Sequence, residues 1–93
     1  MASRKDLKKD VDVLVFDLIS DCYDCIDEDP DRDFSGYEQI INEIIDLEEE
    51  LLSRINQYDS KKGANSHTYF NSIKAELAEG LKKGYEDLKA LNK

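Results

Sequence analysis

The most constraining feature of the sequence is an apolar repeat between Tyr37 and Tyr58. Large apolar side chains recur there three or four residues apart, at Ile40, Ile44, Leu47, Leu51, Ile55 and Tyr58. This spacing predicts an amphipathic helix over residues 36–58, roughly 33 Å long at 1.5 Å per residue. An isolated helix cannot leave such a stripe in water, so other elements must cover it.

Two further segments have the same period. Residues 4–27 place Leu7, Val11, Leu14, Leu18, Cys22 and Cys25 on one stripe, and residues 66–91 do so with Phe70, Ile73, Leu77, Leu81, Gly84, Leu88 and Leu91. Asp29 precedes Pro30 and is pushed out of the helical region, which ends the first helix. Both connections are short. We therefore predict one all-α domain over residues 1–93, an antiparallel up-down-up three-helix bundle.

Gly80 and Gly84 lie on the apolar face of the third predicted helix, where each is about 1 kcal/mol worse than alanine in helix propensity. Counting outward from the turns places them level with four core positions of the other helices, Leu18, Cys22, Ile40 and Ile44. We interpret the glycines as sites of close packing. The alternative is a small notch that accepts a ligand.

The first helix is apolar over more of its circumference than a three-helix bundle requires. Val13, Phe16 and Tyr23 fall outside its main stripe. A small bundle that exposes a contiguous apolar patch usually uses it for association. Either loops or another chain covers this face, and we predict Val13, Phe16 and Tyr23 as interface residues.

Charge is distributed unevenly along the chain, which carries a net −9. Residues 1–9 carry +3, residues 10–59 carry −15, and residues 60–93, with seven Lys and four acidic residues, carry +3. We expect the first two helices to be acidic and the third to be basic, with the charges solvating outer faces and favouring helix docking. Nucleic-acid binding requires a basic patch that the acidic part lacks, so we expect none.

The turn between the first two helices resembles the calcium loop of the EF-hand family. Its carboxylates fall at loop positions 1, 3, 5, 7 and 12, namely Asp27, Asp29, Asp31, Asp33 and Glu38. The pattern departs at loop position 6, where the family requires glycine and this chain has Arg32. Calcium binding here is one hypothesis; weak cation binding without a structural role and a solvated turn are the alternatives. Ser35 and Glu38 also predict a capping box at the start of the second helix.

Cys22 and Cys25 have the spacing of a metal half-site or a redox pair. Both lie near the C-terminal end of a helix among aspartates, which disfavours a thiolate, so we interpret them as buried reduced thiols.

His67, the only histidine, is expected at the exposed start of the third helix. No nucleophile is recognisably paired with it, and we predict a non-enzyme without a cofactor.

The segment 1–9, the cysteines of the first helix and the run from Ile44 to Ile55 together resemble a family of short, uncharacterised helical bacterial proteins. This resemblance implies an all-helical bundle and nothing about activity. Residues 4–27 are interrupted by aspartates, and no stretch of 18 apolar residues occurs. We therefore expect a cytoplasmic protein that does not enter a membrane.

Together these patterns predict a small bundle that acts through protein contact, as a homo-oligomer or an accessory subunit. Two alternatives stay open: a cation-binding module at the acidic turn, and an acidic inhibitor that occupies a basic groove on a partner.

Overall fold

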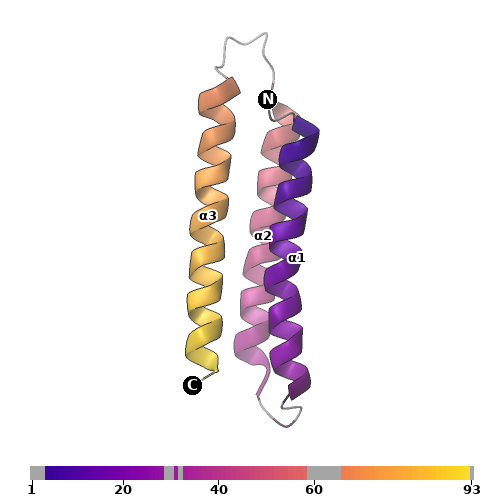
Figure 1. Cartoon of the computed structure of the whole chain (residues 1–93), viewed down its shortest axis with the longest axis vertical. Helices are drawn as coiled ribbons and strands as arrows, with labels where there is room; N and C mark the ends of the chain where they lie inside the picture. Colours follow the sequence, from indigo (N-terminus) through magenta and orange to yellow (C-terminus); the bar gives the residue numbers. More distant parts are fainter. Residues whose placement is uncertain (1–3, 29–30, 32, 59–65, 93) are drawn as a thin grey trace.

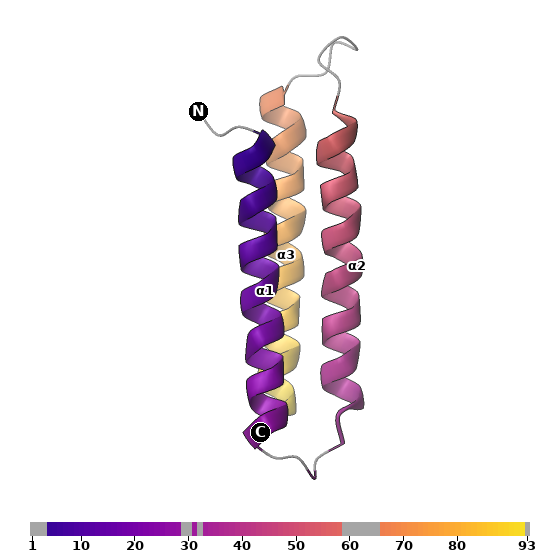
Figure 2. The ribbon, with the colours of Figure 1, turned by 90° about the vertical axis from the view of Figure 1, so that its right-hand side faces the viewer.

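The computed structural model describes residues 4–28, 31, 33–58 and 66–92, and within them the chain forms three helices and no strand. These are α1 (Arg4–Glu28), α2 (Ser35–Gln57) and α3 (Ser66–Leu91). They stand side by side in a bundle of 53 × 19 × 18 Å, with α2 running opposite to α1 and α3 (Figures 1 and 2). The predicted up-down-up bundle is confirmed, and each predicted helix boundary is right to within one residue.

The core is a single apolar seam to which all three helices contribute. Its buried side chains are Leu7, Val11, Val15, Leu18, Cys22, Tyr37, Ile40, Ile41, Ile44, Leu51, Ile55, Ile73, Leu77 and Leu88. No polar or charged residue in the described part of the chain is buried. The fold is therefore stabilised by apolar burial, at about 25 cal/mol per Å² removed from water.

The core-facing stripe of α1 differs from the predicted one at a single position. Leu14 was expected in the stripe, but it is 41% exposed, and Val15 is buried in its place. The observed seam continues from Val11 to Val15 and then Leu18, which is also an i, i+4, i+7 pattern. Because α1 has apolar residues at both 14 and 15, the sequence period allowed either choice, and the position of α2 and α3 decided it.

The two glycines of α3 allow close approach of the other helices, as predicted. A Cβ added to Gly84 would lie 2.5 Å from Leu18 Cδ2, and one added to Gly80 would collide with Leu47 and meet Ile44 Cδ1 at 3.9 Å. The core residues that lie opposite the two glycines are thus within one helical turn of those predicted from the sequence. Leucine side chains from α1 and α2 use the space that the missing methyl groups leave.

Polar contacts join the helices at both ends of the bundle. Near the end of α2, the Tyr69 hydroxyl donates to the Arg54 carbonyl oxygen at 2.6 Å. At the opposite end, the Tyr37 hydroxyl donates to Asn92 Oδ1 at 2.8 Å, and Asn92 Nδ2 donates to Cys25 Sγ at 3.1 Å. The residue that follows α3 therefore contacts both other helices.

The start of α2 differs from the predicted capping box. The helix begins one residue earlier than expected, so Ser35 is its first residue and its hydroxyl does not cap the helix. Instead, Asp33 Oδ1 accepts a hydrogen bond from the Ser35 backbone N–H at 2.9 Å, and the Glu38 N–H donates to the Phe34 carbonyl oxygen. The carboxylate of Asp33 satisfies a backbone donor of the first turn, which is the usual task of a capping side chain.

Candidate interaction surface

Besides Leu14, three large apolar side chains of α1 are exposed. Val13 is 49% exposed, Phe16 is 66% exposed and Tyr23 is 54% exposed. Val13 and Phe16 are three residues apart and Phe16 and Tyr23 are seven apart, so the three lie on one side of the helix. We call this surface the α1 face. The predicted interface residues are thus gathered on one exposed helix surface, and whether a partner covers it stays a prediction.

The C-terminal end of the α1 face opens into a groove between α1 and α2. The groove has a volume of about 450 Å³ and is lined by Tyr23, Ile26, Phe34, Glu38, Ile41 and Asn42. Four of these are apolar or aromatic, and Tyr23 belongs both to the α1 face and to the groove wall. The exposed apolar surface therefore extends from a single helix onto the seam between two helices.

Acidic side chains border the α1 face on both sides. Asp10, Asp17 and Asp24 recur every seven residues along one edge, and all three are exposed. Along the other edge, the carboxyl group of Asp12 of α1 lies close to that of Glu48 of α2. Partial burial, and then the neighbouring Asp12 carboxyl, raise the pKa of Glu48. Residues 10–28 contain no Lys or Arg, so the border of this surface is negative along most of α1.

The expected basic character of the third helix is not found in α3 itself. The residues of α3 include four Lys and four acidic side chains, which balance. Two of these charges pair with α2: Glu76 with Arg54, and Lys83 Nζ with Glu43 Oε2 at 3.5 Å. The predicted attraction between helices is therefore local, and the positive excess of residues 60–93 comes from lysines outside the described residues.

The acidic turn is only partly covered by the structure. Asp29 and Arg32 lie outside the described residues, and Asp27, Asp31, Asp33 and Glu38 are exposed. Asp33 holds the Ser35 N–H, and this hydrogen bond lowers the pKa of the Asp33 carboxyl. Within the described ranges, no three His, Cys, Asp or Glu side chains gather in a way that would hold a metal ion. Calcium binding at this turn stays a prediction.

The two cysteines are free thiols with different environments. Cys22 is fully buried in the core, and burial, together with Cys25 and Asp21 nearby, raises its pKa to about 11. Cys25 is half-buried and accepts the hydrogen bond from Asn92. Both cysteines are thiols, as interpreted from the sequence. Cys22 is fully buried, whereas Cys25 is only partly buried.

His67 is exposed in the first turn of α3, as expected, and its Nε2 lies 3.0 Å from Asn71 Nδ2.

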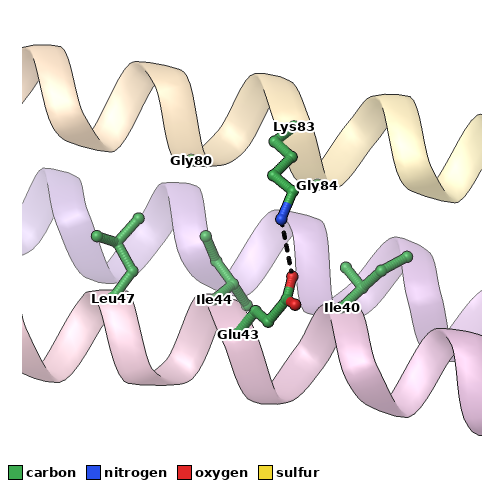
Figure 3. Close-up of a pocket in the computed structure, with 7 residues that line it drawn as sticks. All are labelled: Ile40, Glu43, Ile44, Leu47, Gly80, Lys83 and Gly84. Atoms are coloured by element: carbon green, nitrogen blue, oxygen red, sulfur yellow. Dashed lines mark hydrogen bonds and ion pairs between the residues drawn. The ribbon is translucent and has the colours of Figure 1, made fainter.

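A shallow notch lies over the glycines of α3 (Figure 3). It has a volume of about 250 Å³ and is lined by Ile40, Glu43, Ile44, Leu47, Gly80, Lys83 and Gly84. In Figure 3, Lys83 reaches from α3 across the mouth of the notch to Glu43 on α2. The floor of the notch is apolar. The two charged residues that line it, Lys83 and Glu43, pair with each other.

The groove residues on α2 were not predicted from the sequence. Phe34, directly before α2, lies in the segment predicted as a turn, and no sequence pattern singled out Asn42 as a groove residue. One sequence signal was available for Phe34. An apolar residue directly before the start of a helix often packs against the first turns of that helix.

No helix in the described part of the chain combines the length and the apolar content needed to cross a bilayer. No protein-family model, curated protein or solved structure matches the chain. The resemblance to a family of helical bacterial proteins therefore stays a prediction.

Proposed function

We propose that this protein acts by non-covalent protein contact through the α1 face, as a subunit of an oligomer or an accessory subunit, and that it carries out no catalysis. The observation that carries the proposal is the exposure of Phe16, 66% in the middle of a continuous helix. Leaving an aromatic ring in water forfeits about 2 kcal/mol of burial, and aromatic residues are enriched in the cores of protein interfaces.

The core of the bundle does not need the α1 face. The inner side of α1 already buries Leu7, Val11, Val15, Leu18 and Cys22 against the other helices. Val13, Phe16 and Tyr23 are therefore additional apolar side chains on a surface whose other exposed positions are mainly charged. Because the helix is preformed, binding there requires little ordering of the backbone, which favours association.

Site-specific photo-crosslinking tests the proposal. A photoreactive phenylalanine analogue replaces Phe16 in the full chain, expressed in its own cells, and a matched variant carries the analogue at Glu79, an exposed position of α3. We expect a discrete adduct with Phe16, and its loss when Val13→Asp is added. The mass of the adduct shows whether the partner is a second copy or another protein.

Two results would contradict the proposal. One is equal adduct formation from the two positions, which would indicate random collisions. The other is the absence of any adduct together with a monomer at high micromolar concentration by sedimentation, unchanged in solubility by Phe16→Asp.

A further inference from the structure

We infer that the α1 face is a docking site for a basic amphipathic helix of another protein, and that a second copy of this chain does not occupy it. This inference rests on the proposed function and adds the chemistry of the partner. It follows from the spacing of the apolar side chains and from the acidic side chains that flank them on α1 and α2.

The α1 face has the spacing of a coiled-coil seam. Val13, Phe16, Ser20 and Tyr23 follow one another at three, four and three residues, which is the a/d pattern of a heptad. The small side chain of Ser20 leaves room between Phe16 and Tyr23 for a side chain of a facing helix, as a knob enters a hole. From Val13 to Tyr23 the seam is about 15 Å long, so the matching partner segment is a helix of about three turns.

The borders of the seam select a basic helix. Asp10, Asp17 and Asp24 occupy one flanking position of three successive heptads, and all are exposed. The contact between Asp12 and Glu48 concentrates negative charge on the other flank, where Glu38 lines the adjoining groove. Flanking charges set partner choice in helix pairs. A helix with Lys or Arg at its own flanking positions would place cations along both acidic edges.

The same borders oppose a second copy. In an antiparallel pair of α1 helices that matches Val13 with Tyr23, Asp17 faces Asp17 of the other copy and Asp10 faces Asp24. The two-fold axis passes beside the Asp17 pair and generates the contact of Asp10 with Asp24 twice, because an isologous interface brings identical patches together. The opposing attraction is limited to Lys9 at one end of the seam and Asp27 at the other.

The test uses two synthetic helical peptides of about three heptads. Both carry Leu at the a and d positions; one has Lys at the flanking positions and the other has Glu. Fluorescence anisotropy measures their binding to the full chain at about 50 and about 300 mM NaCl. We expect the Lys peptide to bind at least about tenfold more tightly than the Glu peptide, and its affinity to fall at the higher salt concentration.

Matched variants separate docking on this face from general attraction to an acidic protein. Asp17→Lys with Asp24→Lys alters two border charges seven residues apart. Glu79→Lys with Glu86→Lys makes the same change in net charge, also seven residues apart, on exposed positions of α3. We expect the first pair to weaken binding of the Lys peptide at least about tenfold and the second pair less than about threefold. Phe16→Ala should weaken it about tenfold as well.

Each alternative outcome overturns the inference in a recognisable way. Equal binding of the two peptides, or equal losses from the two charge pairs, would show that the borders of the α1 face select nothing. A stable dimer that Phe16→Asp dissociates would identify a second copy as the occupant, and the proposed function would then stand without this inference. Circular dichroism of each variant establishes that it is folded, and all of the substituted side chains are exposed.

Discussion

At the residue scale, Gly80 and Gly84 occupy the same face of α3 but meet neighbours with different freedom. The methyl group of Gly84→Ala would lie 2.5 Å from a Cδ atom of Leu18, which is fully buried. The methyl group of Gly80→Ala would collide with Leu47, which is only half-buried at the mouth of the notch. Alanine gains about 1 kcal/mol in helix propensity at either position, whereas overpacking a closed core costs about 1–3 kcal/mol.

The two substitutions should therefore have opposite effects on stability. We expect Gly84→Ala to lower the free energy of unfolding by about 1 kcal/mol, because Leu18 has no space to move into. Gly80→Ala should leave it unchanged or raise it by up to about 1 kcal/mol, because the Leu47 side chain can turn outward. Urea denaturation followed by circular dichroism measures both. Equal losses at the two positions would show that neither leucine can adjust.

The buried thiol of Cys22 gives a second prediction. Folding raises the pKa of Cys22 to about 11, because its thiolate would be desolvated and would face Cys25 and Asp21. In Cys25→Ser, which retains only Cys22, we expect a disulfide reagent at neutral pH to react only as fast as the bundle opens, since the thiolate is the reactive form. Cys22→Ser, which retains Cys25, is the control and should react faster. Equal rates in the two variants would contradict the burial of Cys22.

At the scale of the helices, two carboxyl groups, those of Asp12 and Glu48, lie close together beside the apolar contact of α1 with α2. The pKa of Glu48 is raised, first by partial burial and then by the carboxyl of Asp12, so folding favours its protonated form. A raised pKa stabilises the fold fully below the unfolded-state value of about 4.5 and loses that stabilisation as the pH rises through the folded-state value. At neutral pH the two carboxylates repel each other across the α1–α2 contact.

Removing this repulsion should stabilise the bundle. We expect Glu48→Gln to raise the free energy of unfolding at pH 7 by about 0.5 kcal/mol, the typical magnitude for a partly exposed charge pair. Near pH 3, where Glu48 is protonated, the gain should vanish. Asp46→Asn removes one charge from an exposed position of α2 and is the matched control. Chemical denaturation at the two pH values measures the difference, and a destabilised Glu48→Gln at pH 7 would contradict the predicted repulsion.

The helices were predictable from sequence because each depends on local information. The period of α2 is strict, and Pro30 limits how far α1 can extend, so the bounds of both were right to within a residue. The contact of Asp12 with Glu48 and the groove at Phe34 depend on the axial offset between α1 and α2, which no local pattern determines. The exposure of Phe16 was predictable because the core side of α1 was already filled.

At the scale of the whole molecule, α1 and α2 both carry a net negative charge, so electrostatic repulsion opposes their packing. The residues of α1 include eight acidic and four basic side chains, and those of α2 include six acidic side chains and one Arg. Two described ion pairs join α2 and α3, Arg54 with Glu76 and Lys83 with Glu43, and their groups are exposed except for Arg54, which is partly exposed. Such pairs contribute about 0–1 kcal/mol each, so the repulsion between the acidic helices should dominate the electrostatic balance at neutral pH.

Salt should therefore stabilise this protein. Raising NaCl from about 20 to about 500 mM shortens the Debye length from roughly 20 Å to about 4 Å, which screens repulsion between helices more than it weakens exposed pairs in direct contact. We expect the midpoint of thermal unfolding at pH 7 to rise by roughly 5 °C, which corresponds to about 1 kcal/mol for a domain of this size. Near the isoelectric point, pH 4.5, the net charge is close to zero and the same salt increase should have little effect. A fall in the midpoint at pH 7 would mean that the α2–α3 ion pairs outweigh the repulsion, because screening destabilises the fold only where the attraction between its charges exceeds the repulsion.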